Sequence, residues 1–351
     1  MMMYKENAAN RSVLLIYTGG TIGMTENPET GVLESFNFEH LLNHVPELKR
    51  FNYYIATYRF NPPIDSSDMQ PSDWVKLVEI ISDNYERFDG FVILHGTDTM
   101  SYTASALSFM LENLGKPVIL TGSQLPIGML RTDGKENLIT AIEIAAASNP
   151  DGTPIVAEVC ILFENSLMRG NRTTKISAEN FNAFRSYNYP VLAHVGIHIK
   201  YETHLLHKPC LTHPVKPHFR LDTNVVVFTL FPGIREEVVS ALFHIPGLRA
   251  VIMKTFGSGN APQKKWLIEL LQEAMQKNIL VVNITQCPVG IVAMERYETG
   301  RQLLSAGVIS GYDITQESAL AKLMFLLAQD LPVDEIRKRM NSNVAGEITK
   351  E

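Results

Sequence analysis

Cysteine is scarce in this sequence, with three residues in a chain of 351. They are Cys160, Cys210 and Cys287, and no two of them lie close enough in sequence to form a C-x-x-C metal site. Three scattered cysteines also cannot form a disulfide framework, so the chain is typical of a reducing compartment. We expect all three to be ordinary buried thiols.

Long apolar runs and basic clusters are also absent. The apolar run at 13–17 is far too short for a signal-peptide core or a membrane span. Lys and Arg number 31 against 37 Asp and Glu, which gives a net charge of −6, and no basic stretch offers a site for nucleic acid or anionic lipid. We therefore expect a cytoplasmic protein that binds a small neutral or zwitterionic molecule and neither nucleic acid nor a membrane.

The composition is that of a globular protein, with 45% hydrophobic and 19% charged residues. Short apolar runs alternate with stretches of helical spacing, which is typical of an α/β fold with a mostly parallel sheet and helices on both faces. The alternation pauses at about 200–222, where prolines interrupt it. We predict a larger N-terminal α/β domain at 1–200, a linker at 201–222 and a smaller C-terminal α/β domain at 223–351.

The expected elements follow from the same pattern. Strands are predicted at 12–17, 91–95, 117–122, 158–163, 224–231, 249–256 and 279–284. Helices are predicted at 99–113, 133–147, 234–245, 263–277, 318–329 and 332–340.

In open parallel sheets, loops that follow the carboxyl ends of strands carry the function. The first such loop is T-G-G-T-I-G at 18–23. Its glycines lack the G-x-G-x-x-G spacing of a dinucleotide fingerprint, and the residues after it do not start a helix. Adjacent glycines permit a tight turn that would direct the hydroxyls of Thr18 and Thr21 into a cleft. The alternative is that both threonines only stabilise the turn through hydrogen bonds.

The second loop, H-G-T-D-T at 95–99, places Thr97 beside Asp98. A hydroxyl next to a carboxylate at a strand end suits nucleophilic catalysis, and Gly96 frees the backbone for close approach to a ligand. The alternative is that Asp98 or Thr99 only caps the helix that follows.

Two further loops carry polar side chains. In I-D-S-S-D-M at 64–69, the hydroxyl of Ser66 could bind a substrate carboxylate, or the polar residues after it could cap the next helix. In M-R-G-N-R-T-T-K-I-S at 168–177, a lysine brought beside Thr97 could activate that hydroxyl or act as its base. The alternative for this second loop is a solvated basic edge.

Histidines are concentrated near the predicted linker, where six of the ten lie between residues 194 and 218. There is no H-E-x-x-H motif, Cys210 is isolated, and Glu202 is the one acidic residue among them. We expect a histidine-rich linker surface and no metal site. The six are His194, His198, His204, His207, His213 and His218.

Taken together, T-G-G-T-I-G and H-G-T-D-T-M resemble the two signature motifs of the bacterial-type L-asparaginase family. The likeness continues in order through D-S-S-D-M, Y-T-A-S-A-L-S-F-M-L-E-N-L-G-K-P-V-I-L-T-G-S-Q, R-G-N-R-T-T-K, S-G-N-A-P-Q, N-I-T-Q-C-P-V-G and G-V-I-S-G-Y-D-I-T. Within the family, the chain is most similar to the cytoplasmic type I enzymes. The resemblance implies two α/β domains, a homotetramer built as a dimer of dimers, and hydrolysis of L-asparagine to L-aspartate and ammonia without metal or cofactor.

The resemblance also implies roles for individual residues. Thr21 is the nucleophile that attacks the side-chain amide and forms an acyl-enzyme ester. Lys175 tunes Thr97 for proton transfer, and Asp98 holds both the lysine and the α-amino group of the substrate. Backbone N–H groups in the turn at 96–97 would stabilise the oxyanion, at about 3 kcal/mol for each well-placed donor. The side chains expected to line the substrate pocket are Asp65, Ser66, Ser67, Thr97 and Asp98.

The sequence departs from the family pattern at a tyrosine that assists the nucleophile. The corresponding position on the loop after the first motif is Val32, so the phenol must come from elsewhere or be dispensable. The candidate replacement is Tyr297, in E-R-Y-E-T-G of the second domain. Asn260 is a candidate for contact with the active site of a neighbouring subunit.

A second departure concerns regulation, because type I enzymes can carry an allosteric asparagine site. An arginine of that site corresponds here to Lys254. Arginine binds a carboxylate through two parallel hydrogen bonds and lysine does not, which puts effector binding in doubt. The candidate allosteric residues are Thr174, Lys254, Thr285, Gln286 and Cys287.

Other functions fit parts of the sequence. Glutamine could also be hydrolysed, because one methylene changes binding by only about 1–3 kcal/mol. A tRNA-dependent amidotransferase subunit is disfavoured, since such relatives carry an extra N-terminal domain and 17 residues precede Thr18. A non-catalytic amino-acid sensor would be expected to lack a catalytic residue, and none is missing. Pro262 replaces the third glycine that an oxidoreductase would need in G-S-G-N-A-P.

Overall fold

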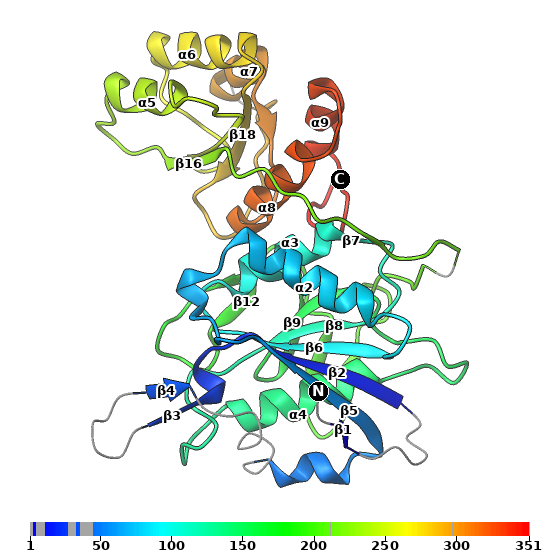
Figure 1. Cartoon of the computed structure of the whole chain (residues 1–351). Coiled ribbons are helices and arrows are strands. Elements are labelled where there is room, and N and C mark those ends of the chain that lie inside the picture. The colour runs from blue at the N-terminus through cyan, green and yellow to red at the C-terminus, as the bar shows by residue number, and fades with distance from the viewer. Residues whose placement is uncertain are drawn as a thin grey trace. The chain divides into compact units, whose positions relative to one another are not determined.

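The computed structural model describes residues 3–4, 11–26, 33–35, 45–210, 212–296 and 298–350. The chain divides into two compact units, Met1–Phe219 and Arg220–Glu351. Each unit combines its own sheet and helices around its own hydrophobic core (Figure 1). Among the described residues, no helix has both the length and the apolar character needed to cross a membrane.

The first unit contains a nine-stranded sheet in the order β1-β5-β2-β6-β8-β9-β10-β13-β14. Its five central strands, from β5 to β9, are parallel, and the strands at both edges are antiparallel. The predicted α/β fold with a mostly parallel sheet is confirmed. In sheet order the strands are β1 Met3–Tyr4, β5 Tyr53–Arg59, β2 Arg11–Tyr17, β6 Gly90–Leu94, β8 Val118–Thr121, β9 Val159–Phe163, β10 Ser166–Arg169, β13 Ala193–Val195 and β14 Ile199–Tyr201.

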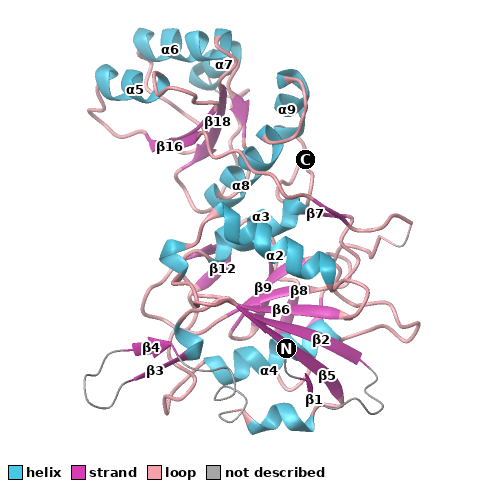
Figure 2. Ribbon diagram, in the orientation of Figure 1, coloured by secondary structure: helices cyan, strands magenta, loops and turns pink. Residues whose placement is uncertain are grey.

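Helices cover both faces of this sheet, with α2 and α3 on one face and α4 on the other (Figure 2). The central strands are therefore buried on both sides, which explains why they read as continuous apolar runs rather than as alternating ones. The helices expected at 99–113 and 133–147 are present as α3 and α4. The helix bounds are α2 Pro71–Asp83, α3 Met100–Met110 and α4 Gly134–Ala146.

The order of the strands predicts a ligand-binding crevice at the carboxyl ends of β2 and β6. From β2 the chain continues to β5 on one side, whereas from β6 it continues to β8 on the other side. Ligands of open parallel sheets bind where the order of the strands diverges in this way. The loops predicted to carry chemistry follow these two strands.

The second unit has a four-stranded, fully parallel sheet in the order β16-β17-β18-β19. The three strands predicted here are present, and β19 was not predicted. The strands are β16 Val225–Thr229, β17 Ala250–Thr255, β18 Leu280–Thr285 and β19 Ile309–Ser310. The helices are α5 Glu236–Phe243, α6 Lys265–Gln276, α7 Glu298–Ser305, α8 Gln316–Leu327 and α9 Val333–Met340.

Short pieces complete the fold. Within the stretch predicted as a linker, β15 pairs with β7 of the first unit. The prediction of three buried thiols was wrong for two of them, because Cys160 is buried whereas Cys210 is half-buried and Cys287 is exposed. The remaining elements are β3 Met24–Glu26, β4 Leu33–Ser35, β7 Leu111–Glu112, β11 Thr173–Lys175, β12 Phe184–Ser186, β15 Lys216–Pro217, η1 Thr21–Gly23, η2 Pro46–Arg50, η3 Ser66–Asp68 and η4 Gly170–Arg172.

A buried ion pair anchors the C-terminal segment of the second unit. The Nζ of Lys322 on α8 lies 2.5 Å from the Oε1 of Glu347, and both side chains are fully buried. The lysine also donates to the carbonyl oxygens of Met340 and Ser342, and the carboxylate accepts from the backbone N–H of Ala345 at 2.7 Å. Burial lowers the pKa of Lys322, and the attraction of Glu347 opposes that shift.

We expect Lys322→Met to destabilise the protein by about 3–5 kcal/mol, because it leaves the Glu347 charge buried without its partner. The measurement is urea unfolding followed by fluorescence. The control is Lys265→Met, which removes an exposed pair with Glu269 and should cost less than about 1 kcal/mol. Equal losses for the two variants would contradict the structural role of the buried pair.

Candidate active site

Thr18 ties together three segments at the carboxyl edge of the main sheet. Its backbone N–H and its hydroxyl both donate to the carbonyl oxygen of Leu94, at 3.0 Å each. Its own carbonyl accepts the N–H of Ile64 at 2.7 Å. Thr18 is almost completely buried, so the alternative in which it stabilises the turn is confirmed for this threonine.

The loops after β2, β5 and β6 touch one another through glycine backbone. A Cβ on Gly20 would lie 2.5 Å from the Cα of Gly96, and Gly20 has a φ of +91°. A Cβ on Gly96 would in turn lie 2.4 Å from the Oγ of Ser66. Neither distance is possible for a real Cβ atom, so the three loops can converge only because both residues are glycine.

Thr21 follows this contact and begins η1, where it is half-buried. The ring of Tyr17 packs directly against η1, since a Cβ on Gly23 would lie 2.2 Å from the Tyr17 hydroxyl. Burial raises the pKa of Tyr17 to about 12, so this phenol stays neutral. Val32 and Tyr297, the two positions considered for the assisting tyrosine, lie outside the described residues.

Lys175, Thr97 and Asp98 come together as a cluster. The Nζ of Lys175, at the end of β11, donates to the Oγ1 of Thr97 at 2.8 Å and to the Oδ1 of Asp98 at 2.7 Å. The lysine side chain is 18% exposed and that of Asp98 is 63% exposed. One ammonium group therefore holds both the hydroxyl and the carboxylate.

Gln124 completes this cluster and was not identified from the sequence. Its Oε1 accepts the hydroxyl proton of Thr97 at 3.3 Å. Its Nε2 donates to the carbonyl oxygen of Asn180 at 3.0 Å, and its backbone N–H donates to the carboxylate of Asp133, which fixes the orientation of the amide. The available signal was its position, because Gln124 lies in the loop after β8, which is the next strand beside β6.

Buried arginines position the segment that carries Lys175. Arg169 pairs with Glu158 at 2.6 Å, and both side chains are almost completely buried. The guanidinium of Arg169 also lies over the ring of Tyr189, and the hydroxyl of Thr173 donates to the carbonyl of Arg169 at 2.7 Å. Arg172 is buried as well, so the alternative of a solvated basic edge was wrong.

The D-S-S-D segment, residues 65–68, contacts the loop at 95–99 that carries Thr97 and Asp98. Asp65 is exposed, and its Oδ1 accepts from both the backbone N–H and the hydroxyl of Ser67 at 2.9 Å. Ser66 is buried, and its carbonyl accepts the hydroxyl of Thr99 at 2.6 Å.

The helix-capping alternatives do not describe the side chains next to these loops. Thr99 is at the N-cap of α3 but makes no side-chain cap, because its hydroxyl donates to the D-S-S-D segment instead. At the start of α2, the carboxylate of Asp73 accepts the backbone N–H of Gln70. Capping there uses residues other than those the sequence suggested.

The residues predicted for regulation are divided between the units, with Thr174 on β11 and the others in the second unit. The Nζ of Lys254 donates to the Oε1 of Gln316 at 2.9 Å. The Nε2 of Gln286 donates to the carbonyl of Lys254 at 3.1 Å. The hydroxyl oxygen of Thr285 accepts the backbone N–H of Cys287 at 3.0 Å. The Oδ1 of Asn260 accepts the hydroxyl of Thr299 at 2.9 Å.

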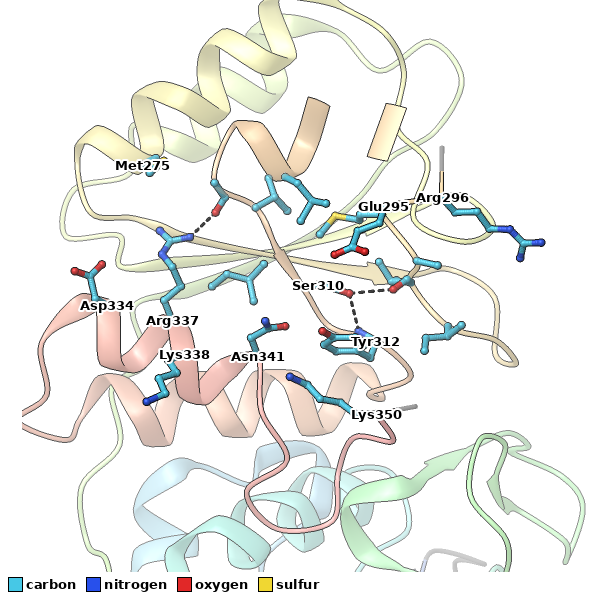
Figure 3. Close-up of a pocket in the computed structure, with 18 residues that line it drawn as sticks. Met275, Glu295, Arg296, Ser310, Tyr312, Asp334, Arg337, Lys338, Asn341 and Lys350 are labelled. Carbon is cyan, nitrogen blue, oxygen red and sulfur yellow. Dashed lines mark hydrogen bonds between the residues drawn. The ribbon is translucent and has the colours of Figure 1, made fainter. Parts of the chain in front are cut away.

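A separate cavity of about 910 Å³ lies within the second unit, beside β19 and α9 (Figure 3). Its polar groups are largely engaged with their surroundings. Arg337 donates to the carbonyl of Gly307, the hydroxyl of Ser310 donates to the carbonyl of Val292, and the ammonium of Lys350 lies over the ring of Tyr312. The cavity contains none of the predicted site residues.

Comparisons with known proteins agree with this architecture. Residues 12–207 match the family described as "Asparaginase, N-terminal", and residues 224–340 match "Glutaminase/Asparaginase C-terminal domain". The chain is 46% identical to L-asparaginase 1 of Escherichia coli K12, over 97% of this chain and 98% of that one. It is 40% identical to the human 60 kDa lysophospholipase, over 97% of this chain and 62% of that one. L-asparaginase I of Vibrio cholerae has a similar crystal structure, with a TM-score of 0.87 and 43% identity, covering 97% of this chain and 99% of that one.

Proposed function

The chain belongs to the asparaginase family, and from this premise we propose that it hydrolyses L-asparagine to L-aspartate and ammonia through a threonine acyl-enzyme. The observation that carries the proposal is the bridge formed by the Nζ of Lys175 between the Oγ1 of Thr97 and the Oδ1 of Asp98. An amide is a poor electrophile, so its hydrolysis needs an activated hydroxyl, a charge relay and donors for the oxyanion. The residues that we assign to these tasks lie in the loops after β2 and β6, with Lys175 bonded to the second of them.

In the first half of the reaction, the Oγ of Thr21 attacks the side-chain carbonyl carbon of asparagine. The developing oxyanion is stabilised by the backbone N–H of Thr97, and the proton lost by Thr21 passes to the leaving ammonia with the help of Thr97 and Lys175. The C–N bond breaks and leaves an ester on Thr21. Water then cleaves the ester, which releases aspartate and restores the hydroxyl.

The other end of the substrate is held by charge and by hydroxyl groups. Asp98 and Asp65 offer carboxylates to the α-ammonium group, and Ser66 and Ser67 offer donors to the α-carboxylate. Asp98 and Asp65 are both exposed at the carboxyl edge of the sheet, which suits them to binding a charged amino acid that arrives from solvent.

Assembly and location are part of the same proposal. We propose a cytoplasmic homotetramer built as a dimer of dimers, with Asn260 and Tyr297 as the candidates for residues that complete the site. Light scattering after size-exclusion chromatography should give four times the chain mass. A monomer that retains full activity would contradict it.

Thr21→Ala should abolish ammonia release from L-asparagine, because it removes the hydroxyl that forms the ester in the proposed reaction. Lys175→Met should lower kcat by about 10²–10⁴-fold, the usual contribution of proton transfer in catalysis. Initial rates of ammonia release, with circular dichroism to verify folding, provide the measurement. The matched control is Lys200→Met, an exposed lysine on β14 that should leave the rate unchanged.

Two results would refute this mechanism. One is a wild-type protein that releases no ammonia at millimolar asparagine. The other is a Thr21→Ala variant that keeps full activity.

We further propose that asparagine regulates the enzyme through Thr174, Lys254, Thr285, Gln286 and Cys287. Lysine binds a carboxylate as a point charge rather than through a bidentate fork, so the effector should bind weakly. The initial rate should therefore rise sigmoidally with asparagine concentration, with a midpoint that Lys254→Arg shifts to lower concentration. A hyperbolic curve for both proteins would show that regulation has been lost.

A further inference from the structure

Three buried side chains form a continuous line of hydrogen bonds that ends at the loop carrying Thr97, residues 95–99. The Nε1–H of Trp74 on α2 donates to the Oγ1 of Thr103 on α3 at 2.9 Å. The same oxygen lies 2.8 Å from the Nε2 of His95, and the Nδ1 of His95 lies 2.7 Å from the carbonyl oxygen of Gly96. Thr103 and His95 are completely buried and Trp74 is 5% exposed, so the line is sealed from solvent.

Only one arrangement of protons suits this line when the imidazole is neutral. A carbonyl oxygen can only accept, so the Nδ1 of His95 must carry the proton that it donates to Gly96. The Nε2 is then an acceptor, and the hydroxyl of Thr103 must donate to it. That hydroxyl can still accept from Trp74, whose indole can only donate. Each donor therefore has an acceptor, and the tautomer of His95 is fixed from both sides.

The electrostatics of the site support the neutral form. Burial lowers the pKa of His95 to about 4 and outweighs the opposing effects of Gly96 and Asp73. An imidazolium would also donate from Nε2, so the Thr103 hydroxyl would have to accept from both the ring and the indole and could no longer donate its proton to His95. At neutral pH the ring is therefore uncharged and does not donate a proton to the substrate. It acts as a clamp, because it holds the carbonyl oxygen of Gly96.

The clamp has a geometric consequence for the neighbouring residue. The carbonyl of Gly96 and the N–H of Thr97 belong to one planar trans peptide unit and point in opposite directions. When His95 holds that carbonyl, the N–H of Thr97 must point away from the ring. Within the described part of the chain this N–H has no hydrogen-bond acceptor, although the side chain of the same residue is engaged by Lys175.

We propose that Trp74, Thr103 and His95 are positioning residues that aim the backbone N–H of Thr97 at the oxyanion of the reaction. The inference rests on the proposed function for the identity of that oxyanion. The three residues touch neither the substrate nor the reacting atoms, and they act through the orientation of one peptide plane. A donor fixed before the substrate arrives stabilises the transition state without reorganisation at the moment of reaction.

The test compares two substitutions of His95 that place an amide at different ends of the ring. His95→Asn puts its amide nitrogen near the position of Nδ1 and keeps a donor for Gly96. His95→Gln puts its amide near Nε2 and leaves Gly96 without a donor. We expect kcat for asparagine to fall at least about tenfold in His95→Gln and to stay near the wild-type value in His95→Asn. KM and the Kd for aspartate should change little in both, because the oxyanion exists only during reaction.

Equal losses in the two variants, or a larger loss in His95→Asn, would overturn the proposal. If either His95 variant fails to fold, the same comparison is made between Thr103→Val and Thr103→Ser. Only the valine variant removes the hydroxyl, so it alone should lose kcat while aspartate binding is kept. Similar kcat values for these two variants would also overturn it.

Crystal structures of the variants separate this inference from the proposed function. The Gly96–Thr97 peptide plane should turn in His95→Gln and keep its orientation in His95→Asn. An unchanged plane in both refutes the positioning role even if the enzyme is active. A plane that turns as expected in a protein without asparaginase activity would support the positioning role and refute the function.

Discussion

The active site depends on one constraint, the contact between the backbones of Gly20 and Gly96. Parallel strands bring their carboxyl ends to one edge, but neighbouring loops normally keep side chains between them. Here a Cβ on Gly20 would overlap the backbone of Gly96, so the loop that carries Thr21 and the loop that carries Thr97 can meet directly only because this residue is glycine. The hydrogen bonds of Thr18 to Leu94 and from Ile64 fix the same loops to the sheet. Candidate catalytic groups from separate parts of the chain are thus held together by backbone contacts.

Much of this arrangement was accessible from the sequence, because the local pattern determines it. Continuous apolar runs predicted buried parallel strands, and the loops after them identified Thr97, Asp98 and Lys175, which the structure brings together. The glycine spacing of the first loop argued against a dinucleotide turn, and in the structure that loop enters the short 3-10 turn η1 rather than an α-helix. Of the two threonines in that loop, the resemblance assigned a catalytic role to Thr21 alone, and the buried hydrogen bonds of Thr18 agree with a structural role for it. The catalytic role assigned to Thr21 remains a prediction.

What the sequence did not reveal depends on tertiary partners. Gln124 was missed because its role comes from the orientation of its amide, which Asn180 and Asp133 impose from distant positions. The alternative of a solvated basic edge stayed open for Arg169, since nothing local shows that Glu158 neutralises it inside the fold. The sequence also did not reveal the strands β10, β13 and β14, because such short antiparallel strands lack a distinctive periodicity. Cys287 was expected to be buried, as free cysteines usually are, and it is exposed. The cysteine content of a chain does not reveal which cysteine lies beside solvent.

The site divides its work between charged groups near solvent and neutral groups in the interior. Lys175 and Asp98 carry their charges at the mouth of the crevice, where water offsets the cost of ionisation. Trp74, Thr103 and His95 lie where a charge would be expensive, and each of them is neutral with its donors and acceptors matched. In the proposed reaction, proton movement and substrate charge are confined to the exposed side of Thr97, and in the proposed positioning role its backbone N–H is directed from the buried side. Because a neutral clamp does not titrate near neutral pH, changes in the protonation of the exposed cluster need not disturb the direction of the donor.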